Sequence, residues 1–323
     1  MNEELKIKFW GVRGSYPTPG ANTIQVGGNT ACVEIQAGNK TIILDAGTGI
    51  IPLGRELARR AAIEKKGLEL LLLFSHLHHD HIQGFPFFVP AYLPNARLHI
   101  FGAGNDNATL KNVLEHNQSS EIFPVSLRDM ASTKYIQTVQ ETQTIVWDEE
   151  NVRVVESNVR LSDEAVVIHI HKSYAHPGCV FVYRISWRGK SVVYATDTEG
   201  YVGTDRKLVA FARDADVLIH DAQYSDEHYY GARVGFSSTQ GFGHSTPSMA
   251  CEVAASAETG QLILFHHDPN YSDAMVAEQE DHAKKMFTDS FAAREGFEIK
   301  LNTIPDPLGI RNERMDVQYV KND

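Results

Sequence analysis

A short run, His76-Leu77-His78-His79-Asp80-His81, contains four side chains at spacings that can bind metal ions. On an extended chain, residues two apart point to the same side, so His76 and His78 can hold one ion. Asp80 and His81 come just after, where the chain is expected to turn, and can reach a second ion. Imidazole suits zinc, manganese or iron. The run follows apolar residues 70–74, and catalytic groups collect at the ends of such buried strands. A metal site is therefore favoured over a solvated histidine-rich loop.

Two ions need more ligands than this run supplies. Asp197 ends an apolar stretch at 192–195 and is the best candidate for a carboxylate that bridges both ions. His176, followed by Pro177-Gly178, is the candidate for the first ion, and His266 for the second. A single loop histidine such as His176 would usually have only a backbone partner. Because the other candidate ligands accompany it, a role in metal binding is favoured here.

Two pairs of segments echo one another along the chain. Asp45 directly follows the apolar residues 41–44, and Thr196-Asp197 directly follows residues 191–195. A short turn-forming segment precedes each of these apolar stretches. Residues 70–74 lead to His76, as residues 262–265 lead to His266. Each pattern predicts a buried strand with a chemically active side chain at its end. Two similar halves predict two facing sheets with one shared site, and chance similarity of short apolar strands is the alternative.

Three segments have helical patterns. Residues 50–65 carry apolar side chains at helical spacing. Thr246 and Pro247 predict a capped helix start that leads through 249–257. Ser272 or Asp273 is expected to begin an amphipathic helix that runs to about Arg294. Region 105–160 is weakly periodic, with a strand expected at 144–147, and is assigned to the same domain.

Composition narrows the function classes. Lys and Arg number 30 against 41 Asp and Glu, a net charge of −11. Long nucleic acid is therefore not expected as the partner, whereas a small anion on a metal site is compatible with this charge. Cys32, Cys179 and Cys251 lie far apart, which argues against a disulfide framework. The acidic start differs from a signal peptide, and the longest apolar run is too short to span a bilayer, so a cytoplasmic protein without membrane contact is expected.

The order of these motifs resembles the metallo-β-lactamase superfamily over residues 5–275. The motifs are Asp45 in Leu-Asp-Ala-Gly-Thr-Gly, the His76–His81 run, His176, Asp197 in Ala-Thr-Asp-Thr, and His266. The resemblance implies two divalent ions, Zn²⁺ or Mn²⁺. His76, His78 and His176 would hold one ion, Asp80, His81 and His266 would hold the other, and Asp197 would bridge them. It also implies that Asp45 orients a ligand and that residues 1–323 form one α/β domain, a four-layer αβ/βα sandwich.

A second pair of motifs resembles the ribonuclease Z branch of that superfamily. His220-Asp221-Ala222 and Gly243-His244-Ser245-Thr246 match its acid and its catalytic histidine, although Asp221 stands where that branch usually has Glu. By this resemblance, Asp221 orients His244, and His244 stabilises the reacting phosphate or protonates the leaving oxygen. Asp80 is expected to accept the proton of the attacking water while it binds metal. The alternative for His244 is a loop histidine near the helix start.

The function predicted first is a phosphodiesterase that cleaves a small phosphodiester, above all a cyclic nucleotide, by attack of a hydroxide that bridges the metals. Ribonuclease Z-like processing of tRNA 3′ ends is the alternative. Hydrolysis of a carboxylic ester, lactone or thioester comes third, and a metal-binding sensor without turnover comes last. Relatives of this kind imply a homodimer.

Two further segments flank the predicted site. Arg13 is expected to contact phosphate or to form a surface salt bridge. Residues 85–92 are rich in aromatic side chains, for which core packing is the first interpretation, and a dimer surface or a stacking platform for a base comes second.

Overall fold

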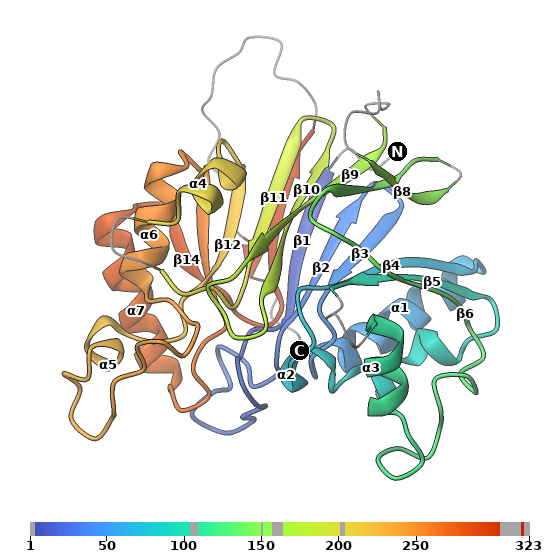
Figure 1. Cartoon of the computed structure of the whole chain (residues 1–323), viewed down its shortest axis with the longest axis horizontal. Coiled ribbons are helices and arrows are strands. Elements are labelled where there is room, and N and C mark those ends of the chain that lie inside the picture. The colour runs from blue at the N-terminus through green and yellow to red at the C-terminus, as the bar shows by residue number, and fades with distance from the viewer. Residues whose placement is uncertain are drawn as a thin grey trace.

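Two β-sheets lie face to face between two layers of helices (Figure 1). The computed structural model describes residues 4–103, 109–149, 151–156, 164–200 and 204–303, and the backbone of 318–319. Helices α1 and α3 lie on one side of the sheet pair, and α4, α6 and α7 on the other. This layer order confirms the predicted αβ/βα sandwich. That residues 1–323 form one domain stays a prediction.

The first sheet has the order β16-β15-β1-β2-β3-β4-β5-β6. Its strands are β1 (Glu4–Gly11), β2 (Cys32–Ala37), β3 (Lys40–Leu44), β4 (Leu68–Phe74), β5 (Ala96–Gly102), β6 (Thr133–Thr138), β15 (Phe297–Asn302) and β16 (Gln318–Tyr319). Burial alternates along β1, where Leu5, Ile7 and Phe9 are buried. This period of two is expected of a strand with one face on the core.

The second sheet has the order β14-β13-β12-β11-β10-β9-β7-β8. Its strands are β7 (Gln143–Trp147), β8 (Val152–Glu156), β9 (Val166–Ser173), β10 (Val180–Trp187), β11 (Lys190–Ala195), β12 (Val217–Asp221), β13 (Gln261–Phe265) and β14 (Ser290–Ala292). Strands β12 and β13 are buried along their whole length because helices cover the outer face.

The echo seen in the sequence corresponds to a shared position in the two sheets. Strand β3 is antiparallel to β2 and parallel to β4. Strand β11 is likewise antiparallel to β10 and parallel to β12. The second echo is displaced by one strand, because β4 is adjacent to β3 whereas β12 separates β13 from β11.

The two helix starts that capping residues predicted are found in the structure. The helices are α1 (Ile50–Glu64), α2 (His79–Ile82), α3 (Leu110–Asn117), α4 (Arg206–Ala212), α5 (Asp226–Tyr229), α6 (Pro247–Ser256) and α7 (Asp273–Met286), with 3-10 turns η1 (Phe85–Phe87) and η2 (Val89–Tyr92). The Thr246 side chain accepts a hydrogen bond from Met249 N and caps α6 as predicted. Ser272 caps α7 in the same way.

The expected continuation of the last helix to Arg294 is wrong. Helix α7 ends at Met286, and Phe287 is already extended. Residues Ser290–Ala292 instead form β14, which pairs in parallel with β13. The apolar spacing that resembled a helix arises because Phe287 and Phe291 pack against different parts of the core.

Region 105–160 supplies edge elements to both sheets. It contains α3, β6 on the first sheet, and β7 and β8 on the second; β7 confirms the strand expected at 144–147. Leu110, Leu114, Leu127 and Met130 share a core cluster with Ile43 of β3. The described part of this region therefore packs onto the sandwich and has no separate core.

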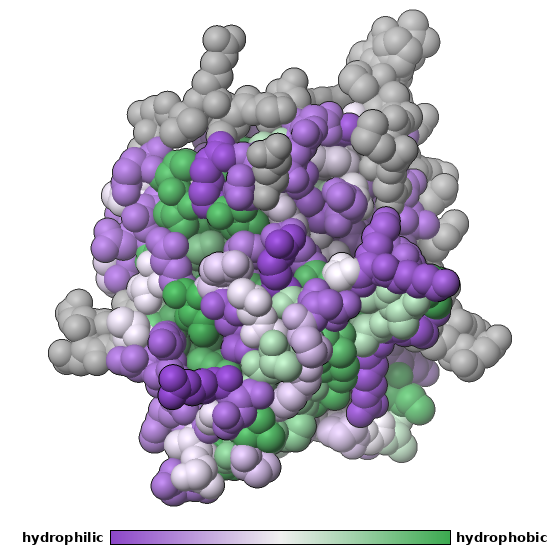
Figure 2. Space-filling model, turned by 90° about the vertical axis from the view of Figure 1, so that its right-hand side faces the viewer, coloured by the Kyte–Doolittle hydropathy of each residue, from purple (hydrophilic) through white to green (hydrophobic). Residues whose placement is uncertain are grey.

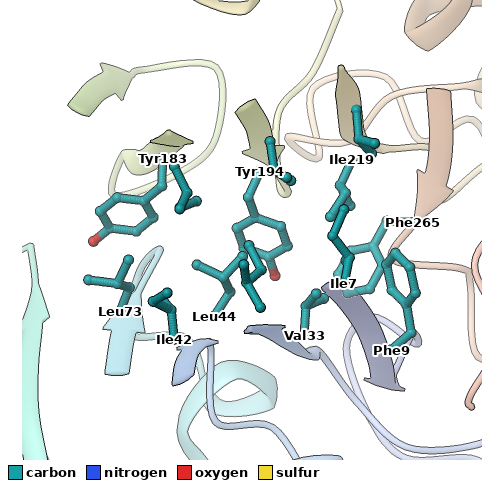
Figure 3. Packing of buried hydrophobic residues seen from close by; sticks show 14 of the residues in the cluster. Ile7, Phe9, Val33, Ile42, Leu44, Leu73, Tyr183, Tyr194, Ile219 and Phe265 are labelled. Carbon is teal, nitrogen blue, oxygen red and sulfur yellow. The ribbon is translucent and has the colours of Figure 1, made fainter. Parts of the chain in front are cut away.

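The space between the sheets is filled by one apolar cluster (Figure 3). Ile42, Leu44 and Leu73 point from the first sheet toward Tyr183 and Tyr194 of the second. Both tyrosine hydroxyls reach across, because Tyr183 donates to Phe74 O at 2.7 Å and Tyr194 to Asp45 Oδ2 at 2.8 Å. The core thus ties the ends of β3 and β4 to the opposite sheet.

The surface over the right-hand side of Figure 1 is of mixed polarity, with hydrophobic groups interleaved among hydrophilic residues (Figure 2). No helix of the described residues is long and apolar enough to cross a bilayer.

Candidate metal centre

The histidine-rich run lies where β4 ends and α2 begins. His76 and His78 follow the strand, and His78 has extended backbone at the residue that precedes the helix. The short helix then turns Asp80 and His81 inward, where both are buried. His78 and His79 are both exposed, but only His78 is among the clustered donor atoms of the described residues. The strand end therefore presents His76 and His78 in one direction, and the helical turn presents Asp80 and His81 in another.

One group of donor atoms combines this run with residues of the second sheet. His78 Nδ1 lies 3.0 Å from His176 Nε2. Asp197 Oδ1 lies 3.7 Å from His76 Nε2 and 3.9 Å from His176 Nε2. His176 comes from the turn between β9 and β10, and Asp197 follows β11.

The other group lies on the opposite side of the same carboxylate. His266 Nε2 lies 3.2 Å from both Asp80 Oδ2 and His81 Nε2. Asp197 Oδ2 lies 3.3 Å from His81 Nε2 and 3.4 Å from His266 Nε2. Each oxygen of Asp197 thus faces a different group.

These donor atoms fit two divalent ions. Nitrogen and oxygen ligands about 2.0–2.2 Å from a tetrahedral ion lie roughly 3.3–3.6 Å apart, close to the separations within each group. Within the described residues, His76 Nε2 is buried without a hydrogen-bond partner although it points at Asp197. A buried orphaned nitrogen is costly unless a cation binds it. All seven predicted ligands converge, and the assignment of each to an ion remains a prediction.

The electrostatics of the cluster also favour bound cations. Burial lowers the pKa of His76 well below its usual value, and His81 lowers it further, so a neutral lone pair is available. Burial acts in the same direction on His81, but Asp197, Asp80 and Asp45 outweigh it and raise its pKa well above the usual value. Carboxylates that favour a proton on His81 equally favour a cation in that place.

Hydrogen bonds from outside the cluster orient its side chains. Asp45 Oδ1 accepts from Ser75 N, and its Oδ2 accepts from Ser75 Oγ, both at 2.7 Å. The same Oδ2 lies 2.8 Å from His81 Nδ1 and accepts from Tyr194. Asp45 thus lies against the ligand that the resemblance implied, and such contacts set the tautomer of a ligating imidazole.

Two other imidazoles are held in a similar way. His176 Nδ1 lies 2.9 Å from Gly243 O, and His266 Nδ1 lies 3.0 Å from Gln223 Oε1. A proton on each Nδ1 leaves Nε2 free to face the cluster. Gln223 was not found from the sequence, because nothing in its local pattern indicates that it meets His266.

Asp221 and His244 form a hydrogen-bonded pair beside the cluster. His244 Nδ1 lies 2.7 Å from Asp221 Oδ2, and the other carboxylate oxygen accepts from Ser245 N at 3.0 Å. The His244 ring centroid is 5.0 Å from that of His266. Burial lowers the pKa of His244, but the charge and hydrogen bond of Asp221 outweigh this and raise the pKa to about 9. Cations in the cluster would act in the opposite direction.

Glu199 fastens the loop that carries His244. Its Oε1 accepts from Tyr229 Oη at 2.6 Å and Gly241 N at 2.7 Å, and its Oε2 accepts from Gly243 N at 2.9 Å. Gly243 has a φ of +88°, and a Cβ there would lie 2.4 Å from His176 Nδ1. One carboxylate therefore fixes the peptide that faces His176 and immediately precedes His244. Sequence reasoning missed Glu199, although it lies two residues after Asp197.

The loop after β1 covers the second group. Ser15 N donates to Asp80 Oδ2 at 2.7 Å. A Cβ at Gly14 would lie 2.4 Å from the His266 ring, so only glycine fits there without displacing a ligand.

Both expectations for Arg13 are wrong. Its side chain is buried and donates to Gly27 O at 2.8 Å, Asp268 O at 3.0 Å and Tyr271 O at 2.7 Å. It therefore cross-links loops behind the centre. In the aromatic segment, Phe85 and Phe88 are buried in the core, which confirms core packing there.

Comparison with known proteins identifies the family. Residues 40–267 match the family described as the Beta-lactamase superfamily domain. This chain belongs to that superfamily. Ribonuclease Z from Picrophilus torridus is 24% identical over 94% of this chain and 97% of its own length. The metallo-β-lactamase fold protein YhfI from Bacillus subtilis has a TM-score of 0.64 at 19% identity and covers 93% of this chain and 100% of its own.

The short form of human tRNase Z has a TM-score of 0.59 at 17% identity, covering 91% of this chain and 98% of its own. At these identities the two solved structures show the fold alone. Family membership and the converging His and Asp side chains make this protein a metal-dependent hydrolase.

Proposed function

We propose that this protein is a phosphodiesterase that uses two divalent metal ions and the His244–Asp221 pair. The observation that carries the proposal is the position of this pair beside a carboxylate shared by two ligand groups: His244 Nδ1 lies 4.0 Å from Asp197 Oδ1 and 2.7 Å from Asp221 Oδ2. A carboxylate that faces two ligand groups suits a pair of ions, and an imidazole beside it can donate a proton or a hydrogen bond to a reacting oxygen.

His76, His78 and His176 would hold one ion, Asp80, His81 and His266 the other, and Asp197 both. When bound, such ions attract a phosphate group and lower the pKa of a water molecule. Their identity, zinc or manganese, is part of the proposal.

The protein's own residues supply orientation and proton transfer. Asp221 engages His244 Nδ1 and leaves Nε2 to donate to a phosphate oxygen or to the leaving oxygen. Asp80, whose Oδ2 accepts from Ser15 N, would accept a proton from the attacking water. Asp45 is a positioning residue that acts through His81.

The relatives favour RNA as the substrate, cleaved in the manner of ribonuclease Z, because the ribonuclease Z of Picrophilus torridus aligns over nearly the whole chain. This favours the alternative over the cyclic nucleotide expected first. A small cyclic nucleotide remains a second candidate for one reason: the net charge of −11 opposes binding of a long polyanion.

The test uses the purified protein loaded with Zn²⁺ or Mn²⁺. Substrates are a tRNA precursor with a 3′ extension, cyclic mononucleotides and dinucleotides, and a carboxylic ester, a lactone and a thioester. Cleavage of the precursor at the 3′ end supports the ribonuclease Z reading, and ring opening of a cyclic nucleotide supports the second candidate. Hydrolysis of acyl substrates alone would overturn the phosphodiesterase proposal. The oligomeric state, predicted to be a homodimer, follows from light scattering of the same sample.

A further inference from the structure

A small pocket opens directly beside the first ligand group. Its volume is about 210 Å³, and its walls include Leu77, His78, Ala103, Val113, Pro177 and Cys179. Among the described residues, none of the side chains that line it belongs to Asp, Glu, Lys or Arg. An uncharged, mainly apolar hollow therefore adjoins the cluster of His and Asp side chains.

The pocket walls are tied to the metal ligands. Leu77 lies between His76 and His78, and it packs against the same core cluster as Val113 of α3. The opposite wall is the turn that begins at His176 and closes by a hydrogen bond from Cys179 N to His176 O at 3.0 Å. The ligand groups and the pocket consequently share two backbone segments.

We propose that this pocket binds the nucleobase next to the scissile phosphate, an inference that rests on the proposed function. A phosphate held by the ions leaves its ester substituents at the borders of the cluster. The border at His78 lacks charged side chains, so it suits a flat, uncharged ring better than a second phosphate. Apolar and aromatic side chains commonly supply such contacts, and base contacts of this kind do not require base pairing.

A larger hollow elsewhere does not serve this purpose. It has a volume of about 480 Å³ and lies against α4, where Glu141, His169 and Arg184 contribute to its lining. None of the predicted metal ligands borders it. Its charged groups are engaged, because Glu141 Oε1 pairs with His171 and Arg184 donates to Phe211 O and Arg213 O.

The test fills the pocket with a matched control on the same helix. Val113→Phe places a ring in the pocket, whereas Asn112→Phe adds the same ring at an exposed neighbouring position. Thymidine 5′-p-nitrophenyl phosphate and the 5-(p-nitrophenyl phosphate) of 1,2-dideoxyribose share the leaving group and the sugar, and only the first carries a base. We expect Val113→Phe to lower the ratio of their kcat/KM values by about tenfold or more, and Asn112→Phe to leave it unchanged. An unchanged ratio in Val113→Phe, with both metals bound and the fold intact by circular dichroism, would overturn the proposal.

A binding measurement separates this inference from the proposed function. Calorimetry on the metal-loaded protein compares a nucleoside 5′-monophosphate with inorganic phosphate. Tighter binding of the nucleotide that is lost in Val113→Phe supports the pocket even if no phosphodiester is cleaved. Equal binding of the two anions would reject the pocket even if cleavage occurs. If Val113→Phe unfolds, Val113→Thr takes its place. It keeps the side-chain shape and replaces one methyl group with a hydroxyl, so a smaller loss of nucleotide preference is expected.

The source of the base is identified in the same assay. A cyclic mononucleotide and a short unpaired RNA are each added as competitors. If one of these competitors displaces the nucleoside 5′-monophosphate less well from Val113→Phe than from the unmodified protein, the pocket is assigned to that source. Unchanged competition by both would overturn the assignment of a base.

Discussion

The two halves of the sandwich deliver their side chains to the centre in different ways. The first half contributes four side chains from one run at the end of β4 and the start of α2. The second half contributes His176, Asp197 and His266 from three separate strand ends or turns, and His244 from a loop. A local motif is therefore completed by residues that only the packing of the second sheet brings together.

Asp45 and Asp197 make this comparison sharper. Both follow an echoing strand, and both have left-handed backbone, with φ of 61° and 50°. Asp45 is surrounded by donors from Ser75, His81 and Tyr194. Asp197 Oδ2 accepts a hydrogen bond from Thr196 Oγ1 at 2.6 Å, and imidazole nitrogens of the ligand groups face both of its oxygens. The same turn thus gives one acid that orients and one that can bind cations, according to what faces it.

The largest effect is expected from Asp197→Asn. The amide removes the shared negative charge, so metal content measured by elemental analysis should fall below two ions per chain. Turnover should fall by more than about 10⁴-fold, beyond the usual contribution of one acid–base group. Two retained ions in Asp197→Asn would break the distinction drawn between the two acids.

His244→Ala tests the imidazole beside the ligand groups, which only the second half of the sandwich contributes. Because His244 lies outside both proposed ligand sets, two ions and the fold should be retained, while turnover falls by about 10²–10⁴-fold. Asp221→Ala should cause a smaller loss in the same direction. An aryl phosphodiester, whose leaving group needs no proton, should hide much of the defect if His244 is the general acid. Full activity would remove the argument for a phosphodiester over an acyl substrate.

Asp45→Asn should have an intermediate effect. Replacing one oxygen by an amide disturbs the contacts to Ser75 and His81, so metal affinity should fall by about 10–100-fold, measured by competition with a chelator. Tyr194→Phe removes one donor to the same carboxylate and is the matched control, with a loss of no more than about tenfold. A loss as large as that of Asp197→Asn would show that Asp45 itself binds metal.

The smallest effect is expected from the Glu199 loop attachment. Glu199→Ala removes the acceptor for Gly241 N and Gly243 N, so kcat should fall by about tenfold through misplacement of His244. Glu199→Gln keeps one acceptor oxygen but turns its NH2 group toward the other N–H, so it should recover only part of kcat. Binding of the ion near His176 should weaken in parallel, since Gly243 O faces His176 Nδ1. Unchanged kcat in Glu199→Ala would exclude a positioning role.

Local patterns were sufficient for the parts of this protein whose causes are local. Alternating burial in β1, the Thr246 cap of α6 and the His76–His81 run each depend on residues a few positions apart. Such contacts follow from the period of a strand and the turn of a helix. The end of α7 was beyond local reasoning, because pairing of β14 with β13 replaces the helical hydrogen bonds there.

What the sequence by itself determined is the set of side chains able to bind metal and the strands and helices that carry them. Only the tertiary structure decided which nitrogen faces which oxygen, since His78 meets His176 and Asp80 meets His266 across the two halves. It also decided that Arg13 is buried among carbonyl oxygens and that Glu199 holds the His244 loop. These contacts join residues far apart along the chain, and their geometry depends on how the two sheets pack against each other. No local pattern contains that information.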